Sequence, residues 1–339
     1  MHRVFVLLVV ALVVASPAAP AAGMPAPALR PGEYTWTPEI SPAGPVLVLV
    51  GLPEQRASVY RNGVRIGTTT VSTGKPGHET PTGVFTILQK KREHYSNLYD
   101  DAPMPFMQRL TWDGIALHAG QVPGYPASHG CVRLPEAFAE KLFGITSQGM
   151  TVVITDRAGV APMLAEPALF PASPAPRPGT RAADLSLPAP ADAAFSWQPA
   201  LAPPGALTVV LSLADRQLVA LREGVEIGRA PVSLAGPAPV GTRAYLLLEG
   251  VQADAAPLLP DRPRRRWLQV LGEGGDDPAG ALAPAGLQLD PGFALRLYDA
   301  LAPGATFVVT DEPLAAAPAL TVLQAGDENP PVQPHAGEQ

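Results

Sequence analysis

Cysteine is almost absent from this chain: Cys131 is the only one among 339 residues. A single thiol excludes an internal disulfide, so this cysteine is either incidental or a reactive group. It lies in the stretch Ser128-His129-Gly130-Cys131, and a second histidine, His118, precedes that stretch. Two histidines and a glycine near the thiol favour the reactive interpretation.

Charge is also scarce. Only 16% of the residues are charged, and the net charge of -6 at pH 7 gives no support for nucleic-acid binding. The one basic run, Arg262 with 264–266, is expected to be a solvated loop. Hydrophobic residues make up 47% of the chain, which is enough for real cores, and the length suggests two domains.

Long apolar runs are missing except at the N-terminus, where Val4 to Ala15 is unbroken. Arg3 precedes this run, and Ala19-Pro20-Ala21 follows it as a cleavage pattern, so residues 1–22 are predicted to be a secretory signal peptide. The run is short for a mature membrane anchor, although an uncleaved anchor is the alternative. We therefore expect secretion across the cytoplasmic membrane into the periplasm or cell envelope, without stable membrane insertion after cleavage.

Proline, in contrast, is abundant, and its 42 residues gather with alanine in a few stretches. Between these stretches lie segments rich in β-branched residues, with Asn62-Gly63 as a two-residue hairpin signal. Pro135 to Phe143 is the one clear helix. The predicted order is a signal peptide (1–22), a flexible segment (23–44), a β-rich domain (45–157), a Pro/Ala-rich linker (158–203), a second β-rich domain (204–312) and a disordered tail (313–339).

The second β-rich segment repeats the first. Residues 61–67 correspond to 222–228, and residues 149–156 correspond to 304–311, in the same order. The alternative is a chance likeness between two small β domains that share hairpin glycines. The ordered series of matches favours a duplication.

The predicted second copy lacks the reactive residues. The offset of the last match places Gly286 at the position of Cys131 and Pro284 at that of His129. If the chain arose by duplication, the second copy has therefore kept the fold and lost the chemistry.

Cys131 and His118 have the residue types of a nucleophile and its base. A cysteine attacks as thiolate, and its ordinary pKa lies above neutral, so it needs a base or a positive neighbour. The Gly- and Pro-containing loop 119–127 can turn back to bring the two together, and the N–H groups of Gly130 and Cys131 could face an oxyanion. Three alternatives stay open: a buried structural cysteine, a structural histidine, and zinc held by His118, His129 and Cys131. No ligand spacing supports zinc.

These residues resemble the L,D-transpeptidase catalytic domain family (YkuD-like). The resemblance rests on Ser128-His129-Gly130-Cys131 after His118, and on two upstream motifs, 72–74 and 80–85. The stretch Gly114-Ile115-Ala116-Leu117-His118 is also similar, and the match runs from Val46 to Asp156.

The resemblance implies a mostly β, sandwich- or barrel-like domain with a shallow groove and one short helix. It implies that Cys131 is the acylated nucleophile, that His118 is its base, and that the Ala119 carbonyl orients the base. His129 and Gly130 would line the oxyanion site. No metal or cofactor is implied, and the residues expected to bind substrate are Ser128, Arg133 and Tyr125.

The substrate class implied is the peptide stem of peptidoglycan. A thioester on the cysteine would be resolved by an amine of another stem, which gives a cross-link, by a free D-amino acid, which exchanges the terminal residue, by water, or by an amine of an envelope protein. The alternatives are a cysteine-dependent carboxypeptidase or endopeptidase that only hydrolyses stems or cross-links, and a non-catalytic wall-binding protein.

Overall fold

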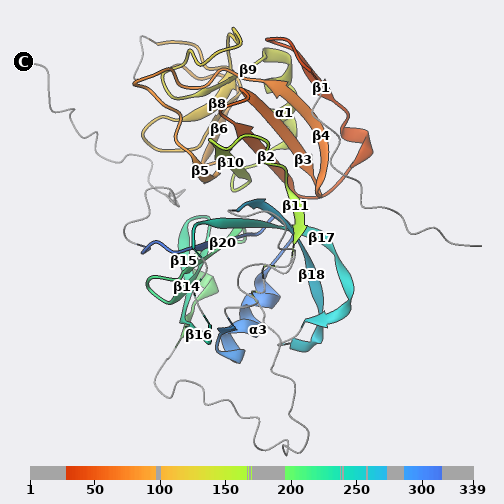
Figure 1. The fold of residues 1–339 in the computed structure, drawn as a ribbon, viewed down its shortest axis with the longest axis vertical. Helices are drawn as coiled ribbons and strands as arrows, with labels where there is room; N and C mark the ends of the chain where they lie inside the picture. Colours follow the sequence, from red (N-terminus) through yellow and green to blue (C-terminus); the bar gives the residue numbers. More distant parts are fainter. Residues whose placement is uncertain are drawn as a thin grey trace, which may run out of the picture.

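The computed structural model describes residues 28–96, 101–165, 195–236, 240–256, 259–272 and 286–314, together with positions 167, 169 and 238. Strands make up 44% and helices 11% of these described residues, which confirms the mostly β prediction. Figure 1 shows two β units, the first coloured red to yellow and the second green to blue. The predicted signal peptide and nearly all of the predicted tail lie outside the described residues. Within the described part, no helix combines the length and apolar character needed to cross a membrane.

The first unit is built on a six-stranded sheet. In their order across it, the strands are β1 (Tyr34–Trp36), β4 (Val64–Thr70), β3 (Arg56–Arg61), β2 (Val46–Gly51), β10 (Thr151–Thr155) and β5 (Gly83–Thr86). Only β2 and β10 pair in parallel. Asn62 and Gly63 have φ of 48° and 83° between β3 and β4, the positive values that a tight two-residue hairpin needs.

Part of the segment predicted to be flexible (23–44) is ordered. Residues 28–44 contain β1 and a 3-10 helix, η1 (Pro38–Ile40). The rings of Tyr34 and Trp36 contact that of Phe138 edge-on, with centroids 5.5 and 5.4 Å apart. Burial of these aromatic rings offsets the conformational freedom that the Pro- and Gly-rich composition indicated.

A four-stranded sheet carries the predicted catalytic residues. Its order is β6 (Gln89–Lys91), β7 (Met107–Arg109), β8 (Ala116–Ala119) and β9 (Val132–Leu134), and helix α1 (Glu136–Ile145) follows β9. The predicted helix is thus present, but it runs through Gly144 to Ile145. Phe138, Ala139 and Leu142 form its buried face.

The second unit contains an eight-stranded sheet. Its order is β11 (Met163–Ala165), β18 (Leu259–Leu271), β17 (Arg243–Ala256), β20 (Thr306–Thr310), β13 (Leu207–Ser212), β14 (Gln217–Arg222), β15 (Val225–Pro231) and β12 (Ser196–Trp197). The smaller elements are η3 (Pro199–Leu201), β16 (Ser233–Leu234), β19 (Leu287–Gln288) and helix α3 (Pro291–Ala300).

Two expectations for this region differ from the structure. The segment predicted to be linker (158–203) contains β11, β12 and η3, because its apolar residues pair with the second sheet. The basic run lies in strand β18 rather than in a loop. Its charges are accommodated beside α3, where Arg262 pairs with Asp299 at 3.0 Å and Arg265 lies 4.6 Å from the Tyr298 ring centroid.

The two large sheets share one topology. The order β1-β4-β3-β2-β10-β5 in the first unit corresponds to β12-β15-β14-β13-β20-β17 in the second, and only β2–β10 and β13–β20 are parallel. The corresponding strand pairs β3–β4 and β14–β15 each contain a register shift, at Val59/Tyr60 and at Ala220/Leu221 respectively. Trp197 meets Phe293 edge-on at 5.4 Å, as Trp36 meets Phe138.

The two sheets also pack against each other (Figure 1). Alternate residues of β2 face opposite ways: Val46, Val48 and Val50 enter the core of the first unit, whereas Leu47 and Leu49 enter a cluster shared with the second. The buried members of this shared cluster are Leu47, Leu49, Tyr60, Val153, Ala244, Leu246, Leu248, Leu268, Val270 and Val308. A sheet that is covered on both faces explains the unbroken apolar run of β2.

Candidate active site

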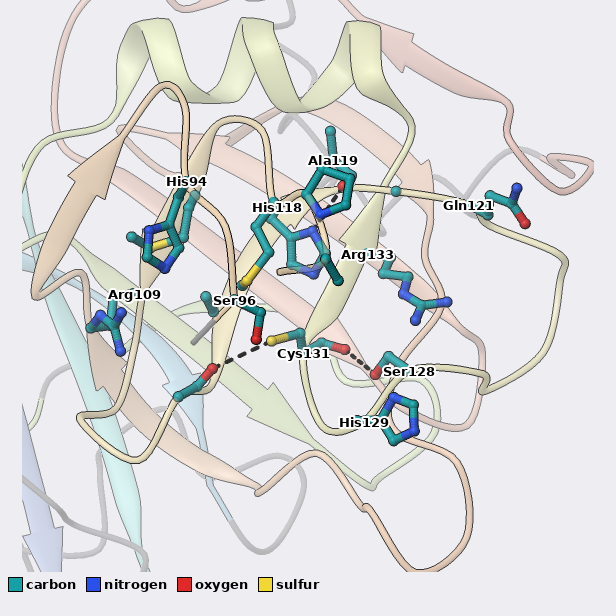
Figure 2. A pocket seen from close by; sticks show the side chains of 17 residues that line it. His94, Ser96, Arg109, His118, Ala119, Gln121, Ser128, His129, Cys131 and Arg133 are labelled. Carbon is teal, nitrogen blue, oxygen red and sulfur yellow. Dashed lines mark hydrogen bonds between the residues drawn. The ribbon is translucent and has the colours of Figure 1, made fainter. Parts of the chain in front are cut away.

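The four-stranded sheet forms the floor of a cavity of about 360 Å³ (Figure 2). Side chains alternate between the two faces of a strand, so the strand register decides which residues meet there. His118 pairs with Arg133 across β8 and β9, and Cys131 lies two positions before Arg133. These three side chains therefore share a face, while Leu117 and Val132 point into the core.

The same register extends the site to β7. Arg109 pairs with Ala116, and Ala116 lies two positions before His118, so Arg109 belongs to the cavity face. The complete lining is His94, Ser96, Ala102, Pro103, Met104, Met107, Arg109, Gly114, Ala116, His118, Ala119, Gly120, Gln121, Ser128, His129, Cys131 and Arg133.

A hydrogen-bonded turn holds Cys131 at the cavity. The Ser128 hydroxyl donates to the Cys131 carbonyl at 2.6 Å and accepts from the Gly130 N–H at 3.1 Å. Gly130 has a φ of 109°, which favours glycine, and a Cβ there would lie 2.7 Å from Ile115. Ser128, expected to bind substrate, is buried, fixes this turn and is among the lining residues of the cavity.

This turn leaves one amide for an oxyanion. The Thr80 hydroxyl donates to the Gly130 carbonyl at 2.7 Å, and the Cys131 N–H points the opposite way across the same planar peptide. The Cys131 N–H donates to no protein acceptor among the described residues. The Gly130 N–H, which the sequence also offered for this role, is already used by Ser128.

His118 is oriented as a neutral base. Its Nδ1 lies 2.8 Å from the Ala119 carbonyl oxygen, the contact expected from the sequence. Because a carbonyl only accepts, Nδ1 carries the proton and Nε2 keeps its lone pair. Burial lowers the pKa of His118 to about 4. The charge of Arg133 also lowers this pKa, whereas the hydrogen bond to Ala119 raises it. The imidazole is therefore unprotonated near neutral pH.

Cys131 is a thiol in this resting arrangement. Burial raises the pKa of Cys131, while a backbone hydrogen bond from Ala116 and the charges of Arg133 and Arg109 act in the opposite direction. The thiol donates to the Gly114 carbonyl at 3.4 Å, and Figure 2 shows it beside His118 in the same cavity. A neutral thiol next to a neutral imidazole favours general-base catalysis over a preformed ion pair.

Alkylation of Cys131 should therefore follow a high thiol pKa. The rate with iodoacetamide, a neutral reagent, should be lower at pH 7 than that of a free cysteine, and should still rise beyond about pH 8.5. The rate constant is measured by mass spectrometry from pH 5 to 10, with the denatured chain as control. A plateau already reached at pH 6 would indicate a thiolate–imidazolium pair instead.

The other predicted residues are distributed differently. His129 lines the cavity, with its ring 4.8 Å from that of His78, and Arg133 lines it as well. Tyr125 is 60% exposed and is not among the lining residues; its carbonyl accepts a hydrogen bond from Ser72 at 2.8 Å. Tyr125 thus contributes through its backbone to the loop before Ser128.

Several lining residues escaped the sequence analysis, above all Arg109 and His94. No alternation marks Met107-Gln108-Arg109 in the sequence, and Met107 and Gln108 are both fully buried, so only the strand register assigns Arg109 to the cavity. In the described part of the chain, no group of three or more His, Cys, Asp or Glu side chains is arranged to hold a metal ion.

Comparison with known families agrees with this geometry. Residues 45–154 match the family model YkuD, the L,D-transpeptidase catalytic domain. The family predicted from the motifs is thereby confirmed for these residues. Among the curated proteins, no relative matches the chain.

Solved structures of L,D-transpeptidases are similar to part of the chain. One from Mycobacterium smegmatis is 23% identical, with a TM-score of 0.32 over 33% of this chain and 59% of that one. One from Stackebrandtia nassauensis is 31% identical, with a TM-score of 0.31 over 34% and 58%. One from Mycobacterium tuberculosis H37Rv is 22% identical, with a TM-score of 0.32 over 33% and 58%. This chain thus spans less than two thirds of each of these proteins.

Proposed function

We propose that this YkuD-family L,D-transpeptidase catalytic domain, residues 45–154, acylates Cys131 with a peptidoglycan stem peptide and passes the acyl group to an amine. One observation carries the proposal: a neutral imidazole, fixed by Ala119, faces the same cavity as the only thiol of the chain. A binding module has no use for such a pair.

The first half-reaction forms a thioester. The Cys131 sulfur leaves its bond to the Gly114 carbonyl, transfers its proton to His118 Nε2 and attacks the carbonyl carbon between the third stem residue, a diamino acid, and D-alanine. The oxygen of the tetrahedral intermediate accepts from the Cys131 N–H. His118 then protonates the departing D-alanine nitrogen as the carbon–nitrogen bond breaks.

The second half-reaction reverses these proton transfers. An acceptor amine enters the cavity, loses a proton to His118 and attacks the thioester, and the sulfur leaves as a thiol. An amine of another stem yields a cross-link, whereas water in its place yields a trimmed stem.

Product analysis tests this proposal. The full chain is incubated with stem tetrapeptides, with and without an acceptor amine, and the products are identified by mass spectrometry. We expect release of D-alanine and an amine-dependent cross-linked product, and neither with the Cys131→Ala variant. Trimmed stems alone would favour the carboxypeptidase alternative. Binding to wall sacculi without any product from the stem peptides would favour the alternative of a non-catalytic wall-binding protein.

The cell envelope is the proposed place of this activity. The support is the predicted signal peptide at residues 1–22, together with a substrate that lies outside the cytoplasmic membrane. An amine of an envelope protein is a further acceptor that the same product analysis can test.

The second unit is proposed to be a non-catalytic copy that supports the first. Its strand order and its aromatic contacts around Phe293 correspond to those of the first unit. Gly286 directly precedes β19, as Cys131 directly precedes β9, so a thiol is missing at this position. The apolar cluster between the sheets supports a structural role.

A further inference from the structure

The cavity is cationic in a chain whose net charge is negative. Its lining contains Arg109 and Arg133, but no Asp or Glu, although acids outnumber bases in the sequence. Such a lining favours anionic groups on the ligand. Arg133 was already expected to bind substrate; Arg109 has no assigned role.

Arg109 and Arg133 lie on opposite sides of the nucleophile. Arg109 pairs with Ala116, and Ala116 is the position that the β8–β9 register aligns with Cys131. Arg109 is therefore two strands from Cys131, about 10 Å between backbones at the usual strand spacing, which an arginine side chain can largely span. Arg133 belongs to the neighbouring row, with His118. Figure 2 shows the two guanidinium groups on either side of Cys131.

The guanidinium of Arg109 has an unsatisfied donor and no salt bridge among the described residues. Its Nε is buried without a hydrogen-bond partner, and among the described residues no carboxylate forms a salt bridge with it. It lies 5.9 Å from the centroid of the Trp112 ring, and the nearby charge of Asp113 acts on it without forming a salt bridge. A partly buried guanidinium with unmet donors is unfavourable unless a ligand supplies the acceptors.

We propose that Arg109 binds a carboxylate of the donor stem, at a subsite separate from that of Arg133. The donor then carries two free carboxylates, one on each side of the bond that Cys131 attacks: that of the diamino acid side chain and that of the terminal D-alanine. Binding of both positions the scissile carbonyl over the sulfur. This inference rests on the proposed function, because the donor is a stem peptide only if that function is correct.

Amidated donors test the subsite. Acylation of Cys131 is followed with a free donor, a donor amidated on the diamino acid side chain and a donor amidated at its C-terminus. With the wild-type chain, each amidation should lower kcat/KM about 10- to 100-fold, the range for one charged hydrogen bond. Arg109→Gln should lower kcat/KM for the free donor by the same factor as one amidation does in the wild type. In this variant, one of the two amidations should then have no further effect. Unchanged preferences in Arg109→Gln would overturn the proposal.

A second experiment does not depend on stem turnover. Iodoacetate and iodoacetamide alkylate the same thiolate, so the ratio of their rates cancels any change in the pKa of Cys131. Arg109→Gln should reduce the ratio of the iodoacetate rate to the iodoacetamide rate about tenfold. Arg109→Lys should reduce it less, because lysine keeps the positive charge but lacks the two-pronged hydrogen-bond geometry of the guanidinium. Arg92→Gln is the matched control: Arg92 follows β6, pairs with Glu140 at 3.2 Å and does not line the cavity, so its loss should leave the ratio unchanged.

The two experiments separate this inference from the proposed function. If the ratio falls but no stem acylates Cys131, the anion subsite stands and the transpeptidase proposal fails. If stems acylate Cys131 while the ratio and the amidation preferences of Arg109→Gln equal those of the wild type, the subsite is wrong. An equal fall of the ratio in Arg92→Gln would also overturn it, since only the general charge of the domain would then matter.

Discussion

Cys131→Ala is expected to abolish covalent acylation by stem donors and by carbapenems, the inhibitors that the family resemblance implies. The variant contains no other thiol, so no neighbouring cysteine can replace the nucleophile. The loss in kcat/KM should exceed about 10³-fold, as for other nucleophiles removed from an acyl-enzyme mechanism. Intact-protein mass spectrometry measures the adduct directly.

The base should matter less than the nucleophile. His118→Gln should slow acylation about 10²- to 10⁴-fold while leaving the adduct detectable after long incubation, because the Cys131 amide still stabilises the oxyanion. Alkylation of this variant by iodoacetamide at pH 7 should stay slower than that of the denatured chain, which shows that Cys131 is still in its folded, buried site. A carbapenem adduct on Cys131→Ala, or acylation of His118→Gln at the wild-type rate, would remove the corresponding residue from the mechanism.

Leu246→Asp is expected to destabilise the whole chain, including the catalytic unit, by several kcal/mol. Leu246 is 1% exposed and lies in the apolar cluster between the two sheets, where an unpaired carboxylate cannot be hydrated. Leu246→Ala should cost about 2–5 kcal/mol through the cavity it leaves. Thermal unfolding by circular dichroism measures the stability, and carbapenem acylation after heating reports on the first unit.

Val251→Asp is the matched control for this experiment. Val251 lies on the same strand, β17, but is 51% exposed, so a carboxylate there should change stability by less than about 1 kcal/mol. Removal of residues 158–339 should destabilise the catalytic unit more than Leu246→Asp does. The truncated domain should aggregate, because Leu47, Leu49 and Val153 become exposed to solvent. A soluble truncated domain that acylates normally would contradict the structural role of the second unit.

The local patterns of the sequence were sufficient for the elements near the site. The hairpin at Asn62-Gly63 follows from the positive φ that both residues adopt readily. The helix after Pro135 was predicted to within two residues of its end, and the two residues that the motif predicts to be nucleophile and base, Cys131 and His118, line one cavity. These features depend on neighbours in sequence, or on motifs that a family shares.

Composition was a poorer guide at the domain boundaries. The Pro- and Gly-rich stretch before Val46 was expected to be flexible, yet Tyr34 and Trp36 bury their rings against Phe138. The basic run was expected to be solvated, yet it forms part of β18. In both cases a distant partner decides the outcome, and such a partner is invisible in a local window.

The sequence by itself determined which reactive groups this protein offers: one thiol, a histidine upstream of it and the residues of the turn before the thiol, because these follow from residue type and order. Only the tertiary structure decided which side chains surround that thiol and how they are charged. Strand register brings Arg109 to the same face as Cys131, burial keeps His118 neutral, and the Ser128 hydroxyl occupies the Gly130 amide. Register and burial are set by contacts between residues far apart in the chain, so no inspection of neighbouring residues could have supplied them.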